Sequence, residues 1–160
     1  MLVCGAMLGI WLDLQWFRPL LTSWLYHLLT FPIGLLLMTF AFRAAAAGGR
    51  ELAKEGKRSP DTPRLETDKL VTTGIYAKMR HPMLFGLTLV PLAFALLIGS
   101  PSYILLIAPV EMIFIVVMVL TFEEWECRKK FGEDYDRYAR EVPAVCFKKE
   151  CLKRLFFNEK

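Results

Sequence analysis

Three long stretches of the sequence carry almost no charge, and they constrain the fold more than any other feature. Pro19 to Phe42 and Met83 to Ser100 contain no Asp, Glu, Lys or Arg, and Tyr103 to Phe122 contains only Glu111. A helix rises about 1.5 Å per residue, so the shortest stretch covers about 27 Å, close to the roughly 30 Å thickness of the hydrocarbon core of a bilayer. Because 55% of the residues are hydrophobic as well, we expect a membrane protein.

The expected fold is an all-α membrane protein, a bundle of about four transmembrane helices with a C-terminal helical hairpin and a cytoplasmic tail. The fourth candidate helix is Met1 to Leu12, which is apolar but short. We interpret it as a retained first helix, because no Lys or Arg precedes its apolar run and no small-x-small cleavage pattern follows it. The glycine pair Gly48–Gly49 is expected to loosen the helix that continues from the second stretch.

Basic residues predict the orientation. Of the twenty Lys and Arg residues, nine lie between Arg43 and Arg80, ten lie between Arg128 and Lys160, and one is Arg18. Both polar segments are therefore expected on the cytoplasmic side of a multi-pass membrane protein. A net charge of +4 needs no nucleic-acid partner, since basic loops beside membranes produce it.

The sequence offers few metal ligands and no pattern typical of disulfides. It contains two histidines, in different segments, and four cysteines, none of which forms a CxxC pair. We therefore expect no metal site. Three of the cysteines fall on the side expected to be cytoplasmic, where we expect no disulfides.

Two charged pairs mark the candidate site. Arg80 and His81 directly precede Pro82, which suits the first turn of a helix, so free backbone N–H groups are expected there and would favour an anionic group. Glu123 and Glu124 leave the last apolar stretch at the same membrane boundary, so opposite charges should meet at one depth. The alternatives are an arginine that reaches the lipid headgroups and a solvated acidic turn whose carboxylates pair with cations at i+4.

A second pairing is predicted inside the membrane. His27 lies eight residues after Pro19 and Glu111 lies eight residues after Tyr103. Counted from the same face, both would lie roughly 12 Å deep. Ionisable groups at such depth usually have partners, so the two side chains are expected to share a hydrogen bond or a proton. The alternative is a neutral Glu111 that bonds a helix carbonyl.

Five short motifs follow one another in the second half of the chain. They are Leu70-Val71-Thr72-Thr73-Gly74-Ile75-Tyr76, Arg80-His81-Pro82 with Gly86, Glu123-Glu124, Phe131-Gly132-x-x-Tyr135-x-x-Tyr138, and Val142-Pro143. In this order, and across a two-helix hairpin, they resemble the superfamily of isoprenylcysteine carboxyl methyltransferases and phospholipid methyltransferases.

The resemblance implies an integral-membrane methyltransferase whose cofactor is S-adenosylmethionine, bound at the cytoplasmic face. It implies a small or lipophilic acceptor, such as an isoprenylcysteine-like carboxylate, a phospholipid amine or a thiol, with membrane lipid as a partner. Arg80 would act next to this acceptor, and Glu124 is the nearest candidate base where the acceptor must lose a proton. The residues implied to bind the cofactor are Val71, Gly74, Tyr76, His81, Pro82, Glu123 and Glu124.

On this interpretation, residues 1–160 form a single membrane domain. It comprises N-terminal helices in 1–43, a cytoplasmic loop in 44–73, a cofactor-binding hairpin in 74–143 and an interfacial tail in 144–160. One departure concerns Leu84, where the family usually has a tyrosine, so one hydroxyl contact is lost.

Two alternative functions stay open. A sterol-type reductase that uses NADPH has a related C-terminal motif, but such enzymes usually carry Asn at the position of Met83. A non-catalytic membrane lipid-binding protein would carry the charged motifs by accident. Binding of S-adenosylmethionine or of its demethylated product would separate these functions.

Overall fold

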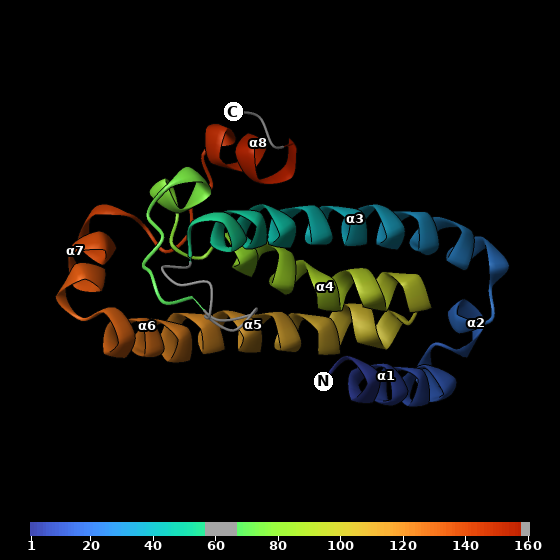
Figure 1. The fold of residues 1–160 in the computed structure, drawn as a ribbon. Coiled ribbons are helices and arrows are strands. Elements are labelled where there is room, and N and C mark those ends of the chain that lie inside the picture. Colours follow the sequence, from blue (N-terminus) through green and yellow to red (C-terminus); the bar gives the residue numbers. More distant parts are fainter. Residues whose placement is uncertain (57–66, 158–160) are drawn as a thin grey trace. The chain divides into compact units, whose positions relative to one another are not determined.

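The computed structural model describes residues 1–56 and 67–157, and every regular element in those ranges is a helix (Figure 1). In chain order these are α1 (Leu2–Trp16), α2 (Arg18–Leu21), α3 (Trp24–Glu55), η1 (Gly74–Ala77), α4 (Pro82–Ile98), η2 (Tyr103–Ile107), α5 (Ala108–Met118), η3 (Val119–Glu123), α6 (Glu124–Phe131), α7 (Glu133–Glu141) and α8 (Lys149–Phe157). The expected all-α class is confirmed. Part of the loop expected in 44–73 lies outside the described residues.

Two helices are long and apolar enough to cross a membrane. One is α3, with 32 residues, and the other is a continuous helix of 29 residues, Tyr103–Phe131, which η2, α5, η3 and α6 form together. The helices α1 and α4 are apolar but shorter, with 15 and 17 residues. The four-helix bundle and the C-terminal hairpin therefore stay predictions.

The chain divides into two compact units. Unit 1 comprises Met1–Phe42 and Gly86–Val117, and unit 2 comprises Arg43–Phe85 and Met118–Lys160. Each is described by itself below.

Unit 1 buries polar groups and exposes large apolar ones. Asp13 is fully buried, and its carboxylate accepts hydrogen bonds from the Ser100 hydroxyl and, at 2.8 Å, from the Ser102 backbone N–H. Large apolar side chains such as Trp11, Phe31, Leu105, Ile113 and Phe114 are at least half exposed. Such a distribution is expected of a surface that faces lipid, where buried polar groups need partners within the protein.

The predicted pairing of His27 with Glu111 is wrong. The Tyr103 hydroxyl donates to Glu111 Oε2 at 3.0 Å, and His27 Nε2 lies 2.7 Å from the Leu21 carbonyl oxygen. The other side of the imidazole lies against Gly99, whose φ of +69° places it in the left-handed region. Equal depth in a membrane does not fix the direction in which a side chain points, and the two residues face different neighbours.

The core of unit 2 joins α3, η1 and α8. Its fully or nearly fully buried members are Ala44, Ala47, Val71, Ile75, Tyr76, Met79, Cys146, Cys151 and Leu155. The helix α8 packs against η1. From this helix, Cys151 and Leu155, 4% and 1% exposed, pack inside the unit.

A disulfide joins Cys146 to Cys151. The expectation of no disulfide on this side of the protein is therefore wrong. The physical reason is local: the chain turns into α8 just after Cys146 and brings the two Cα atoms to 6.0 Å, a separation that a disulfide can bridge.

The helix α3 does not loosen at Gly48–Gly49 but continues to Glu55. A Cβ atom on Gly48 would lie 2.6 Å from Met83 Cγ and 3.1 Å from Pro82 Cγ, whereas a Cβ atom on Gly49 would meet nothing within 4 Å. Gly48 is therefore a position where backbone approaches side chains closely rather than a break in the helix.

Candidate functional site

The backbone of Arg80 and His81 is fixed from two directions. On the N-terminal side, Met79 is fully buried in the core of unit 2, and on the C-terminal side Pro82 begins α4. The Arg80 N–H donates to the Pro143 carbonyl and the His81 N–H to the Ala144 carbonyl, each at 3.0 Å. The segment after α7 therefore satisfies these two backbone N–H groups.

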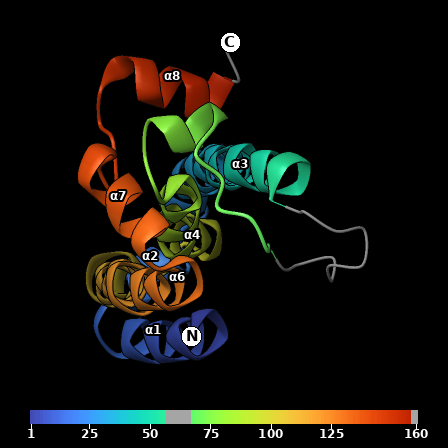
Figure 2. The same cartoon turned by 60° about the vertical axis from the view of Figure 1, so that its left-hand side comes forward.

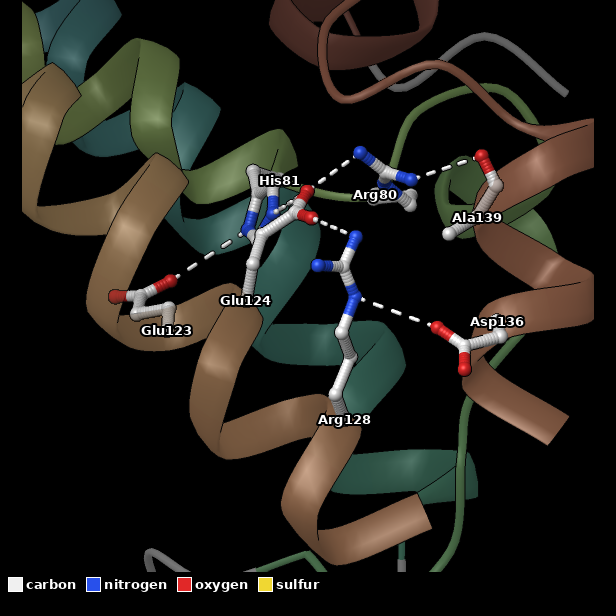
Figure 3. A network of polar contacts seen from close by, with 7 residues as sticks. All are labelled: Arg80, His81, Glu123, Glu124, Arg128, Asp136 and Ala139. Atoms are coloured by element: carbon white, nitrogen blue, oxygen red, sulfur yellow. Dashed lines mark hydrogen bonds and ion pairs between the residues drawn. The ribbon is translucent and has the colours of Figure 1, made fainter. Parts of the chain in front are cut away.

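The Arg80 guanidinium lies between α6 and α7. Its Nη2 atom is 2.5 Å from Glu124 Oε1, and its Nη1 donates to the Ala139 carbonyl at 2.9 Å (Figure 3). The side chain is only 12% exposed. Its Nε atom is buried and has no hydrogen-bond partner among the described residues. The Nε–H donor of the guanidinium is thus left for a bound group.

The His81 imidazole contacts both predicted carboxylates. Its Nε2 atom lies 3.2 Å from Glu124 Oε1 and its Nδ1 atom 3.5 Å from Glu123 Oε2 (Figure 3). The two carboxylates differ in access, because the Glu124 side chain is 10% exposed and that of Glu123 is 53% exposed. Glu124 is therefore the buried partner of Arg80 and His81, and Glu123 remains accessible to a ligand.

A widened helical turn leads into these carboxylates. Val119–Glu123 is π-helical, and α6 begins directly after it at Glu124. Such turns are rare in helices and frequent at functional sites, because they change the direction in which the following side chains point. The adjacent residues Glu123 and Glu124 reach the two nitrogens of one imidazole from this turn.

The network extends through Arg128 to Asp136, a residue that sequence reasoning missed. Glu124 Oε2 lies 3.3 Å from Arg128 Nη2, and Arg128 Nε lies 3.3 Å from Asp136 Oδ1 on α7. Gly132, with φ +57° and ψ −132°, separates α6 from α7, and both views of the fold show α7 leaving the axis of α6 at a sharp angle (Figures 1 and 2). This backbone conformation strongly favours glycine, so the motif residue Gly132 allows Asp136 to return to Arg128.

Two buried tyrosines tie α7 to η1. The Tyr138 hydroxyl donates to the Tyr76 carbonyl at 2.6 Å, and the rings of Tyr138 and Tyr135 meet edge to face at 6.0 Å. Burial raises the pKa of Tyr76 and Tyr138 well above the usual range. Both hydroxyls therefore stay neutral donors at physiological pH.

A third carboxylate, on α3, also lies beside the motif residues. The Thr73 hydroxyl donates to Glu51 Oε1 at 2.8 Å. A Cβ atom on Gly74 would lie 2.4 Å from Glu51 Cδ, so the carboxylate rests against the glycine backbone, which has a φ of +58°. No sequence pattern indicated Glu51, since its place in a polar segment fits a solvated helix turn equally well.

The structure brings some of the predicted site residues into one network and leaves others at its edge. Arg80, His81, Glu123 and Glu124 contact one another directly. The remaining predicted residues belong to the same unit but contribute mainly packing or backbone: Val71 and Tyr76 are buried in its core, Gly74 flanks Glu51, and Pro82 begins α4. In the described part of the chain, no group of three or more His, Cys, Asp and Glu residues could hold a metal ion.

Comparison with known proteins decides the family. A family model described as phospholipid methyltransferase matches residues 29–134, which include Arg80, His81, Glu123 and Glu124. The chain belongs to the phospholipid methyltransferase family. No curated protein and no solved structure matches it.

Membership of the phospholipid methyltransferase family confirms the resemblance seen in the sequence motifs. It implies methyltransferase activity in a membrane-associated protein, consistent with the two helices long enough to span a bilayer. Neither alternative function, the reductase or the non-catalytic lipid-binding protein, gains support from this match.

Proposed function

We propose that the protein transfers a methyl group from S-adenosylmethionine to a lipophilic acceptor at the cytoplasmic face of a membrane. One observation carries the proposal: within the region matched by the phospholipid methyltransferase family, Arg80, His81 and the two adjacent glutamates form one largely buried ionic network. Their chemistry fits the cofactor, which offers a carboxylate, a ribose diol and an adenine.

The chain's own groups would divide the binding between them. Glu123 is half exposed and would accept hydrogen bonds from the ribose hydroxyls. His81 and Tyr76 would hold the cofactor carboxylate, together with backbone near Val71 and Gly74. S-adenosylmethionine supplies an electrophilic methyl group on a sulfonium centre. The protein's tasks are then to align the acceptor and to exclude water.

Arg80 would orient the acceptor. Its buried Nε–H has no partner among the described residues, and a guanidinium can hold a carboxylate or phosphate through two parallel hydrogen bonds. An acceptor carboxylate is already nucleophilic and needs no base. A phospholipid acceptor would present its phosphate to the same guanidinium and its amine to the reaction.

Glu124 would act mainly by positioning Arg80. Its Oε1 faces Arg80 and His81, and its Oε2 faces Arg128. A carboxylate with both oxygens engaged by cations is well placed to orient them. Removal of a proton from an amine or thiol acceptor by Glu124 would require one of these contacts to open.

Ligand binding by the purified protein tests the proposal. Isothermal titration in detergent micelles should detect S-adenosylhomocysteine binding to the wild-type protein and no binding of NADPH. Glu123→Gln should weaken this binding by about tenfold, the usual contribution of a hydrogen bond to a charged group. Glu126→Gln, which changes an exposed carboxylate on the same helix, serves as the control. NADPH binding without S-adenosylhomocysteine binding would instead favour the reductase.

A further inference from the structure

Glu51 is a carboxylate of unit 2 that neither the family motifs nor the network around Arg80 includes. It lies on α3, one helical turn after Gly48, and is half-buried. Its Oε1 accepts a hydrogen bond from the Thr73 hydroxyl at 2.8 Å, and its carboxylate lies against the backbone of Gly74. A side chain at position 74 would occupy the space that the carboxylate fills.

The same face of α3 meets the predicted cofactor residues. A Cβ atom on Gly48 would lie 3.3 Å from the Tyr76 hydroxyl oxygen. The charges of Glu123 and Glu51 both add to the effect of burial in raising the pKa of Tyr76. Glu51 and Glu123 therefore lie within electrostatic reach of one hydroxyl, although they belong to helices far apart in the sequence.

The three glutamates differ in their basic partners. Glu123 faces His81, and Glu124 faces Arg80, His81 and Arg128. No ion pair joins Glu51 to a Lys, Arg or His in residues 1–56 and 67–157. A half-buried carboxylate with one oxygen held by a neutral hydroxyl has a second oxygen available to a cation.

We propose that Glu51 is a further binding residue of this site and that its carboxylate takes the primary ammonium group of a ligand. The inference rests on the proposed function. Two ligands of that reaction carry such a group: the cofactor, as its α-ammonium, and an amine-bearing phospholipid acceptor. An ammonium group there would give Glu51 a cationic partner, as Arg80 and Arg128 do for Glu124.

The competing role for Glu51 is structural: it would hold the Thr73–Gly74 turn and nothing else. Two variants separate the roles. Glu51→Gln keeps an oxygen that can accept the Thr73 hydroxyl but removes the negative charge. Thr73→Val removes that hydroxyl and keeps the charge. A structural role predicts that Thr73→Val is the more harmful change, and a binding role predicts that Glu51→Gln is.

The first measurement uses isothermal titration with S-adenosylhomocysteine and with its deaminated analogue, in which hydrogen replaces the α-ammonium group. If the ammonium is the cofactor's, Glu51→Gln should weaken the binding of S-adenosylhomocysteine by about tenfold or more, the usual scale for a charge-assisted contact. The binding of the analogue should stay unchanged. Equal weakening of the binding of both ligands would indicate a structural role and would overturn this assignment.

The second measurement addresses the acceptor by native mass spectrometry with phosphatidylethanolamine and phosphatidylglycerol of identical acyl chains. If the ammonium is the acceptor's, the wild-type protein should prefer phosphatidylethanolamine, and Glu51→Gln should lose that preference with S-adenosylhomocysteine binding intact. The inference is overturned if Glu51→Gln alters neither the amine-dependent part of cofactor binding nor the lipid preference. Failure of the wild-type protein to bind S-adenosylhomocysteine would instead reject the proposed function, and the lipid measurement would still test Glu51.

Discussion

Arg80 and Glu124 lie 44 residues apart in the sequence and meet with 2.5 Å between Nη2 and Oε1. Their side chains are 12% and 10% exposed. Desolvation offsets much of the attraction in such a pair, so its presence says little about net stability. Its geometry fixes the direction of the guanidinium, and this direction is what the proposed acceptor site needs.

Removing one partner of this pair should be costly. We expect Glu124→Ala to lower the free energy of unfolding by about 3 to 5 kcal/mol, because Arg80 is left as a buried charge without its carboxylate partner. Thermal unfolding in detergent micelles measures the change. Glu126→Ala, on the exposed face of the same helix, should change stability by less than about 0.5 kcal/mol. Equal melting temperatures for the two variants would contradict the buried pair.

Gly48 and Gly49 give a matched test of how closely the Met83 and Pro82 side chains pack against α3. Gly48→Ala should cost about 1 to 3 kcal/mol, because its methyl group would overlap Met83 and Pro82. Gly49→Ala should be neutral or stabilise by up to about 1 kcal/mol, since alanine is the better helix former and its Cβ meets nothing within 4 Å. The same unfolding measurement compares them. If Gly48→Ala were as stable as Gly49→Ala, α3 would not lie against Pro82 as described.

The hydrogen bond from Tyr138 to the Tyr76 carbonyl should be visible in stability. Tyr138→Phe should cost about 1 to 3 kcal/mol, because it leaves a buried carbonyl without its donor. Chemical denaturation at neutral pH measures this cost. A variant as stable as the wild type would show that water or another donor replaces the hydroxyl.

Alkaline pH should destabilise the protein through the same tyrosines. Burial raises the pKa of Tyr76 and Tyr138 in the folded state, whereas in the unfolded chain they ionise near pH 10. The stability that they contribute is therefore complete below about pH 10 and is lost as the pH rises through the folded-state pKa. Melting temperatures from pH 8 to 11 should fall less steeply for Tyr138→Phe than for the wild type. Parallel curves would argue against a raised pKa.

The sequence predicted the contacts among the four charged residues of the candidate site because charged motif residues stand out against apolar stretches. Arg80 and His81 meet Glu123 and Glu124 within unit 2, as their shared boundary position suggested. The i+4 contact from Glu124 to Arg128, expected as an alternative, occurs alongside these contacts. The two interpretations of the acidic turn were therefore not exclusive.

Contacts that depend on backbone atoms or on side-chain direction could not be predicted in this way. The Pro143 and Ala144 carbonyls accept the N–H groups of Arg80 and His81, and no residue pattern encodes that pairing. Glu111 turns to Tyr103 rather than to His27, because depth alone does not determine which face of a helix a residue occupies. The place of Glu51 beside Gly74 depends on α3 continuing past Gly48–Gly49, where glycines usually indicate a break.

Transfer of a radiolabelled methyl group from S-adenosylmethionine into extracted membrane lipids tests the central claim most directly. The wild-type protein should label lipid. Arg80→Lys, which keeps the charge but loses the planar fork, should lower the rate by about 100-fold while S-adenosylhomocysteine binding stays within about threefold of wild type. The account would be contradicted if the wild-type protein labelled no lipid, or if Arg80→Lys and Glu124→Ala both transferred methyl groups at the wild-type rate.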